Sequence, residues 1–361
     1  MPVVPGSAIG IVANPMSGRD IRRLVARASV FPNAEKTNMV LRLIASAGAL
    51  GVHRVCLSTD TMGVAAGVLR AAATRRPRDG RWPELEFCEL AAPTGDAEDT
   101  RASVRRMREL GVRVIVLLGG DGTVRAAASA SGDVPLLPLS TGTNNAFPEM
   151  WEATVAGTAA ALVATGRVRA EDSSRRAKAL RVRCGTVVET ALVDVCVSTL
   201  AHVGSRALWE VGPLRELYCA FAEPHAIGLS SIAGLLDPVG RSEPGGVLVR
   251  MATAPDDPLA RRVLAPIAPG VLAPVAVGSV VRLRPDEPVT SAVARGTVAV
   301  DGEREIEFNP TVPVTVAVTS AGPRVLDVRA VLAEAAGRGL LVSTPGAGPR
   351  HEQDAEYQEV R

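Results

Sequence analysis

The chain of 361 residues carries 40 basic and 38 acidic side chains, a net charge of +2, and 47% of its residues are hydrophobic. This composition indicates a folded globular protein rather than a disordered chain, and the length favours two domains. The balanced charge and an aromatic content of 3% argue against a nucleic-acid-binding surface.

The first part of the chain alternates between apolar strand-like runs and helical stretches. Strands are predicted at residues 8–13, 54–58, 85–90, 112–118 and 134–139. Helices are predicted at residues 34–49, 64–74, 96–110, 123–130 and 154–165. Such alternation predicts a parallel sheet covered by helices, with ligands bound at the carboxyl ends of its strands. We therefore expect an α/β nucleotide-binding domain with a parallel sheet over residues 1–150.

The pattern changes after residue 175, where strands dominate. Strands are predicted at residues 178–184, 187–197, 246–251, 280–283, 296–300, 305–308 and 314–318, and helices only near 205–210 and 214–222. This predicts a β-rich, sandwich-like second domain over residues 151–320, which we expect to hold the acceptor. A helix near 328–334, within residues 321–345, is expected to return to the first domain, and residues 346–361 are expected to form a polar, flexible tail.

No segment predicts export or a membrane span. The N-terminus lacks the basic region of a signal peptide, and the long apolar stretch at residues 263–281 is interrupted by three prolines. The five cysteines include no Cys-x-x-Cys pair, so we expect buried thiols in a reducing compartment. The chain is therefore expected to be cytoplasmic, without an integral membrane segment.

The run Gly119-Gly120-Asp121-Gly122-Thr123 lies directly between a buried strand and a helix. Three glycines allow the backbone amides to turn inward around an anion, and the positive end of the helix faces the same point. Asp121 would repel a phosphate, so its presence favours a carboxylate that accepts the proton of an attacking hydroxyl. The alternative is a tight turn in which an aspartate caps the helix.

Three further segments carry polar groups suited to the same site. Thr141-Gly142-Thr143-Asn144-Asn145 and Asn14-Pro15-Met16-Ser17-Gly18 each follow a predicted strand, although asparagine is also common in turns without a function. Asp301-Gly302-Glu303 reads either as a hairpin turn or as carboxylates that hold magnesium or act as a base. Asp194 stands in an apolar strand, where a carboxylate needs a partner or a site.

Other phosphate-binding motifs are absent. The only lysines are Lys36 and Lys178, and neither follows a glycine-rich loop, which excludes a Walker A motif and the lysine of protein kinases. The sequence contains no Gly-x-Gly-x-x-Gly, and its four histidines lack zinc spacing.

Together the motifs resemble those of the NAD kinase and diacylglycerol kinase superfamily. Gly119–Thr123 resembles the signature shared by both, while Asn14–Gly18 resembles the first-strand motif of the diacylglycerol kinase branch. Gly142–Asn145 is similar to the second loop of that branch, which usually ends in Asp, and Asp301–Glu303 to its acidic motif. On these loops and on residues 9–36 and 204–209, the chain resembles the ATP-NAD kinase relatives associated with acetoin catabolism.

The resemblance implies a cleft between an ATP-binding α/β domain and a β-sandwich. It makes Asp121 the catalytic residue and puts Gly119, Gly120, Gly122 and Thr123 on phosphates, with Asn14, Ser17 and Gly18 as another wall. Gly142, Thr143, Asn144, Asn145 and Asp194 would hold the acceptor, and Asp301 and Glu303 a metal. Val193-Asp194 stands where NAD kinases carry an Asn-Glu pair that holds the NAD adenosine.

We therefore expect an ATP- and Mg²⁺-dependent kinase of a small soluble acceptor, with NAD as the first candidate. One alternative is a lipid kinase of the diacylglycerol or sphingoid type. Another is a nucleotide-binding regulator without catalysis, and polyphosphate is an alternative donor. Kinases of this resemblance are often homo-oligomers, so we expect one here.

Overall fold

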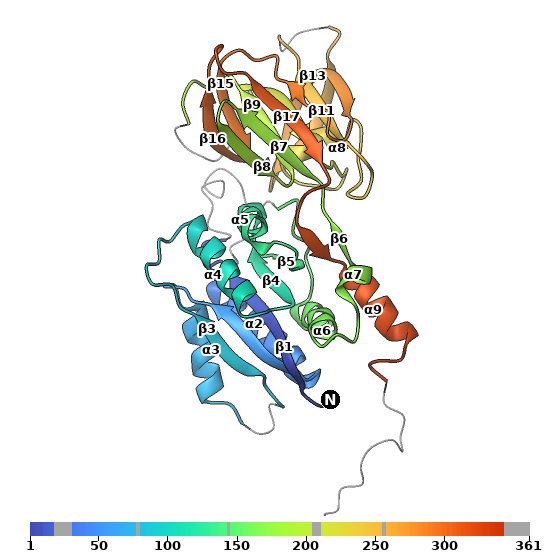
Figure 1. Cartoon of the computed structure of the whole chain (residues 1–361). Coiled ribbons are helices and arrows are strands. Elements are labelled where there is room, and N and C mark those ends of the chain that lie inside the picture. Colours follow the sequence, from blue (N-terminus) through green and yellow to red (C-terminus); the bar gives the residue numbers. More distant parts are fainter. Residues whose placement is uncertain (18–30, 77–79, 143–144, 204–210, 255–257, 343–361) are drawn as a thin grey trace, which may run out of the picture.

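The computed structural model describes residues 1–17, 31–76, 80–142, 145–203, 211–254 and 258–342. An α/β domain and a β-rich domain are stacked end to end (Figure 1). The predicted fold class, an α/β N-terminal domain with a mostly parallel sheet followed by a β-rich region, is confirmed. Residues 205–210 and the tail beyond residue 342 lie outside the described residues.

The first domain is built on a seven-stranded sheet in the order β3-β2-β1-β4-β5-β18-β6. All neighbours are parallel except β6, which runs antiparallel to β18. The strands are β1 (Val4–Ala13), β2 (Val52–Ser58), β3 (Glu84–Cys88), β4 (Val114–Gly119), β5 (Leu136–Ser140), β6 (Ser174–Arg176) and β18 (Arg324–Leu326). Strand β4 is buried along its whole length, as expected for an apolar run covered on both faces.

Helices cover both faces of this sheet. On one face lie α2 (Asn33–Ala49), α3 (Val64–Ala73), α6 (Ala153–Ala164) and α9 (Val328–Gly337), and on the other α4 (Ala97–Glu109) and α5 (Asp121–Ser131). Side chains of β1 alternate between the two layers, since Ile9 and Ile11 pack with the first group and Ala8 and Val12 with the second. No helix in the described part of the chain is long and apolar enough to cross a bilayer.

The second domain is a sandwich of two antiparallel sheets. One sheet has the order β12-β13-β11-β10-β9-β15-β16 and the other β14-β17-β7-β8. Their strands are β7 (Ala179–Cys184), β8 (Val187–Ala191), β9 (Asp194–Ser198), β10 (Leu214–Cys219), β11 (Gly246–Met251), β12 (Arg261–Ala268), β13 (Val271–Leu283), β14 (Val289–Thr290), β15 (Gly296–Val300), β16 (Glu303–Phe308) and β17 (Val314–Thr319). Val182 and Val316 of one sheet share a core with Val195 and Val298 of the other.

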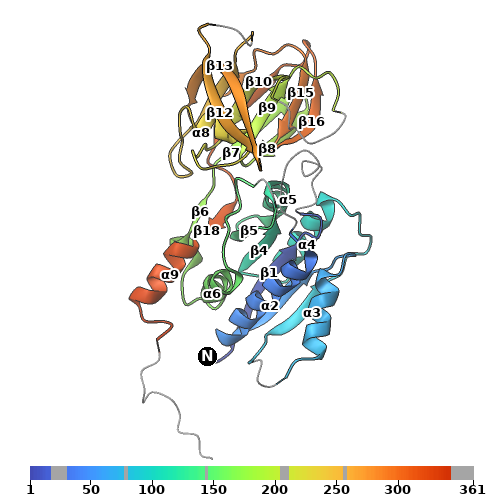
Figure 2. The ribbon, with the colours of Figure 1, turned by 180° about the vertical axis from the view of Figure 1, so that it is seen from behind.

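The chain crosses between the domains twice, from β6 to β7 and from β17 back to β18. After the second crossing, β18 pairs with β5 and α9 packs against α6, as Figure 2 shows from behind. Because α6 packs on α2 and β6 pairs with β18, we propose that the domain boundary lies near Arg176 rather than near residue 150.

Two expectations for the second domain were wrong. The helix predicted at residues 214–222 is strand β10, whose backbone pairs with both β9 and β11. The single strand predicted at residues 187–197 is two strands that belong to different sheets, with a break at Leu192 and Val193. In contrast, the apolar stretch at residues 263–281 lies in the hairpin of β12 and β13, as its prolines indicated.

Candidate active site

Three polar loops meet at the carboxyl ends of neighbouring strands. Residues 14–17 follow β1, residues 119–123 join β4 to α5, and residues 140–145 follow β5. From β1 the chain adds β2 and then β3 on one side of β1. It then returns to add β4 and β5 on the other side, so the strand order reverses between β1 and β4. In open α/β sheets this reversal opens a crevice for ligands.

Side-chain hydrogen bonds tie the three loops together. Asn14 Nδ2 donates to Thr123 Oγ1 at 2.8 Å, and the hydroxyl oxygens of Ser17 and Thr141 lie 2.8 Å apart. The structure thus brings together three residues that the sequence assigned to phosphate binding, Asn14, Ser17 and Thr123. Gly18, Thr143 and Asn144 lie outside the described residues.

Lys36 orders the first loop, a role that the sequence analysis missed. Its ammonium group donates to the carbonyl oxygens of Asn14, Pro15 and Ser17 at 2.9, 3.2 and 2.8 Å, and the side chain is fully buried. A compact ammonium with three donors suits three convergent carbonyls better than the planar fork of an arginine does. The signal was available, since lysine is so rare in this arginine-rich chain.

Three glycines in these loops lie so close to neighbouring side chains that a β-carbon would not fit. A β-carbon on Gly120 would lie 2.7 Å from Asn145 Oδ1, and one on Gly142 would lie 2.6 Å from both Asn145 Oδ1 and Nδ2. Asn145 is itself held by a hydrogen bond from Nδ2 to Ser140 Oγ at 2.8 Å. A β-carbon on Gly119 would lie 2.5 Å from Thr123 Cβ. These glycines therefore let the second and third loops pack directly against each other.

Asp121 lies at the first position of α5, between the second and third loops. Its Oδ1 accepts hydrogen bonds from the backbone amides of Ala146 at 3.2 Å and Phe147 at 2.8 Å. Its Oδ2 is 3.1 Å from the same Ala146 nitrogen. The carboxylate is therefore oriented by the third loop, next to the positive end of the helix.

The second domain forms the opposite wall. Glu303 Oε1 would be 3.7 Å from a β-carbon on Gly122, so this carboxylate faces the turn of the second loop. Arg125 of α5 reaches across, forms a paired hydrogen bond with Glu305, and lies 3.8 Å from Asp301 Oδ2. The guanidinium of Arg125, which the sequence did not single out, links the first domain to the acidic turn of the second.

Asp301 is buried in this turn, where backbone amides bind its carboxylate, and its assignment to a metal stays a prediction. Its Oδ1 accepts from the amides of Leu192, Val193 and Asp194 at 3.0, 2.8 and 3.3 Å. Burial raises the pKa of its carboxyl to about 7, the charge of Asp121 adds to the rise, and the amides and Arg125 oppose it. Among the described residues no group of three or more His, Cys, Asp or Glu side chains could hold a metal ion.

Asp194 does not present an open carboxylate to an acceptor. It is 6% exposed and accepts a contact of 3.9 Å from the Cys196 thiol. It lies directly opposite Cys219 in the sheet, and its charge contributes to raising the pKa of both thiols, after burial as the largest cause. Asp194 is therefore buried within the sheet, and its assignment to acceptor binding stays a prediction.

Comparison with known proteins identifies the two domains separately. Residues 9–168 match the ATP-NAD kinase N-terminal domain, and residues 178–321 match the acetoin catabolism protein X C-terminal domain. The chain is 41% identical to acetoin catabolism protein X of Cupriavidus necator over 342 residues, which is 93% of this chain and 94% of that protein.

Among solved structures, a candidate diacylglycerol kinase from Bacillus anthracis has 11% identity and a TM-score of 0.39, covering 87% of this chain and 97% of that one. The identity and coverage of the Cupriavidus protein are high enough to decide the family. The chain belongs to the acetoin catabolism protein X family, and its residues 9–168 match the ATP-NAD kinase N-terminal domain.

Proposed function

We propose that this protein is a kinase that transfers the γ-phosphoryl group of ATP to a hydroxyl of a small soluble acceptor. The observation that supports this most is the position of Asp121, which two backbone amides orient at the reversal of strand order. The first amides of α5 have no partner within the helix, so they favour an anion. The nucleotide phosphates would lie over Gly119–Thr123, with Asn14 and Ser17 as a second wall.

In this reaction Asp121 is the base. At about 4 Å a carboxylate and a phosphate charge repel each other by about 4 kcal/mol at an effective dielectric constant near 20, so a purely binding site gains nothing from it. The repulsion is accounted for if Asp121 acts as a base. As the acceptor oxygen bonds to the γ-phosphorus, its proton passes to Asp121 and the bond to the leaving ADP oxygen breaks.

Magnesium would enter with the nucleotide. Protein sites for Mg–ATP usually supply only one or two carboxylates, because the phosphates supply the other ligands. Glu303, on the wall opposite Asp121, fits this requirement while Asp121 acts as the base, whereas Asp301 is already bonded to three amides. When bound, the ion supplies positive charge to the transferred group.

NAD is the first candidate for the acceptor, since the N-terminal half matches the ATP-NAD kinase domain. Gly142, Thr143, Asn144 and Asn145 would contact it from the third loop. A second candidate is a nucleotide-binding regulator without catalysis. This alternative is favoured by the burial of Asp194, which stands where NAD kinases carry part of the Asn-Glu pair that holds the NAD adenosine.

The test is product identification with a matched pair of variants. Purified protein is incubated with ATP–Mg²⁺ and NAD, NADH or diacylglycerol vesicles, and products are identified by mass spectrometry. Asp121→Asn should lower the rate of phosphoryl transfer at least about 100-fold, since a positioned base contributes on that scale or more. The Asp133→Asn variant, at an exposed position on the turn after α5, should retain full activity.

Circular dichroism must show that both variants are folded. Undiminished transfer by Asp121→Asn would remove the proposed mechanism. Nucleotide binding without any product would favour the regulator, and a phosphorylated lipid with no reaction of NAD would favour the lipid kinase.

A further inference from the structure

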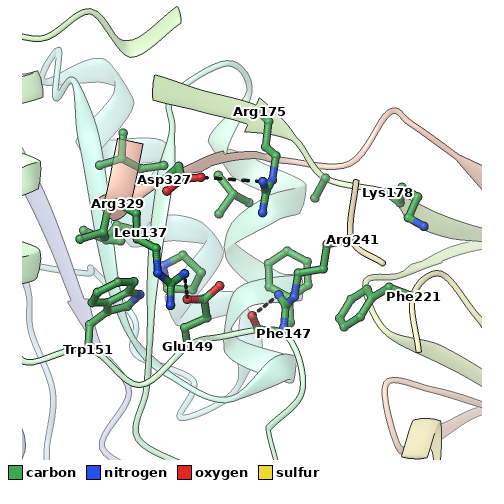
Figure 3. Close-up of a pocket in the computed structure, with 15 residues that line it drawn as sticks. Leu137, Phe147, Glu149, Trp151, Arg175, Lys178, Phe221, Arg241, Asp327 and Arg329 are labelled. Atoms are coloured by element: carbon green, nitrogen blue, oxygen red, sulfur yellow. Dashed lines mark hydrogen bonds and ion pairs between the residues drawn. The ribbon is translucent and has the colours of Figure 1, made fainter. Parts of the chain in front are cut away.

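A separate pocket lies at the junction of the two domains, beside both crossings of the chain. It encloses about 690 Å³ of space, including a mouth that is open to solvent. Residues of β5, β6, β18 and α9 line one side, and loops of the second domain line the other (Figure 3). None of the residues assigned above to nucleotide or acceptor binding lines it.

The lining combines aromatic rings with an excess of positive charge. The cationic side chains are Arg175, Lys178, Arg241 and Arg329, and the anionic ones are Glu149 and Asp327. Arg241 is also paired with Glu223, with Nε 3.3 Å from Oε2, so the cations exceed the anions by one. The rings of Phe147, Trp151 and Phe221 stand between them. A ligand with an apolar body and one negative charge matches this lining.

The guanidinium of Arg175 is available to such a ligand. Its Nη1 is 3.8 Å from Asp327 Oδ2, which exceeds a hydrogen-bond distance, and its side chain is 50% exposed. A carboxylate fits the planar fork of a guanidinium in two parallel hydrogen bonds. Glu149 and Asp327 would repel a dianion more strongly than a monoanion, and this disfavours a phosphate ester.

Arg241 connects this pocket to Asp121 through one peptide unit. Its Nη2 donates to the carbonyl of Ala146 at 2.5 Å, while the amide of the same unit, Phe147 N, donates to Asp121 Oδ1 at 2.8 Å. The amide and carbonyl of a trans peptide point in opposite directions, so Arg241 and Asp121 hold that unit from its two sides. Arg241 also lies over Phe221, 4.4 Å from the ring centroid.

We propose that this junction pocket is a second ligand site, which takes a small organic monocarboxylate with a flat apolar body. The carboxylate pairs with Arg175, and the body lies beside Trp151 and the packed pair of Phe147 and Phe221, whose ring centroids are 6.2 Å apart. This proposal does not depend on the proposed kinase reaction, and its test requires no nucleotide.

The experiment uses Trp151 as the reporter. In a Trp82→Phe, Trp209→Phe variant of the full chain, Trp151 is the remaining tryptophan. Benzoate is titrated against emission, with the neutral isostere benzamide and inorganic phosphate in parallel at constant ionic strength. Calorimetry with benzoate on the unaltered protein is the second measurement. We expect saturable binding of benzoate, with benzamide and phosphate at least about tenfold weaker, the scale of one charge-assisted contact.

Arg175→Gln should weaken benzoate binding at least about tenfold, while the same change at the exposed Arg284 should leave it unaltered. Equal binding of benzoate and benzamide would overturn the proposal, since charge would then play no part. Tighter binding of phosphate would overturn the assignment of a monocarboxylate, and absence of benzoate binding in both measurements would overturn the site itself.

Discussion

At the scale of single residues, the side chain of Asn145 limits how closely the loops at residues 119–123 and 140–145 approach each other. Asn145 fills the space against Gly120 and Gly142, whereas Gly122 has only Glu303 nearby, at ordinary contact distance from a β-carbon. The three glycines look alike in the sequence. Their steric environments differ, so substitution at each has a different expected cost.

Gly120→Ala should lower the free energy of unfolding by about 1–3 kcal/mol, because the new methyl group must displace Asn145 from Ser140. Gly122→Ala, in the first turn of α5, should be neutral or stabilise the protein by up to about 1 kcal/mol, as alanine does in helices. Urea denaturation of both variants measures the change in the free energy of unfolding. Equal changes for the two variants would show that Asn145 moves aside without cost.

Asp301 predicts a pH dependence of stability. Its folded pKa of about 7 lies above its ordinary value of 3.8. Between these values the folded chain holds a proton that the unfolded chain has released. The contribution of Asp301 to stability is therefore full below about pH 4 and is lost as the pH rises toward 7.

Asp301→Asn cannot titrate, and asparagine accepts the positive φ of 50° at this position. The advantage of the unaltered protein over this variant should therefore shrink between pH 4 and pH 7, by at most about 4 kcal/mol. Urea denaturation at half-unit pH steps measures the difference. An advantage that stays constant or grows with pH would contradict the raised pKa.

At the scale of elements, the buried amines of Lys36 and Lys178 each hold a loop in place through hydrogen bonds to backbone carbonyls. The sequence motifs suggest such loops but not their conformation. Lys36→Met keeps the length of the side chain but leaves the carbonyls of Asn14, Pro15 and Ser17 without their donor. We expect a loss of about 3 kcal/mol in unfolding free energy and roughly tenfold weaker ATP binding, since the first loop would shift.

Lys178→Met is the matched control. This buried lysine also donates to three carbonyls, those of Gly240, Glu243 and Gly245, but in the second domain. It should lose stability to a similar degree and bind ATP as before. If calorimetry gives both variants the same ATP affinity, Lys36 does not order a nucleotide site.

The elements also show why sequence reasoning succeeded in the first domain and failed in parts of the second. The loop at residues 119–123 follows from local chemistry, because glycines after a buried strand leave few alternatives. Residues 214–222 have a helical pattern, but pairing with β9 and β11 overrides it. The break at Leu192 exists because Asp301, more than 100 residues later, binds its amide. Contacts between residues so far apart in the sequence leave no local pattern.

At the scale of the whole molecule, Arg125 couples the two domains. It is the residue of α5 that pairs with Glu305 and approaches Asp301 and Glu189 of the second domain. Arg125→Gln leaves the buried Asp301 carboxylate without its nearest cation. We expect unfolding free energy to fall by about 3 kcal/mol and the domains to unfold in two calorimetric transitions.

Arg101→Gln, which removes a surface ion pair with Glu98 on α4, should change stability by less than about 0.5 kcal/mol and keep the transition pattern. The two variants should therefore differ in scanning calorimetry, and small-angle scattering should show a larger radius of gyration for Arg125→Gln alone. If both variants unfold alike, the apolar core that runs from Val124 and Phe147 into the sandwich couples the domains without Arg125.

The burial of both lysines gives this protein an unusual response to acylating reagents. Each amine lies beneath carbonyl groups, one in each domain, and arginine does not react with a succinimidyl ester. Modification of Lys36 or Lys178 therefore requires local opening of the surrounding structure. The rates of acylation at these two positions, read separately by mass spectrometry, would report the opening of each domain without any engineered label.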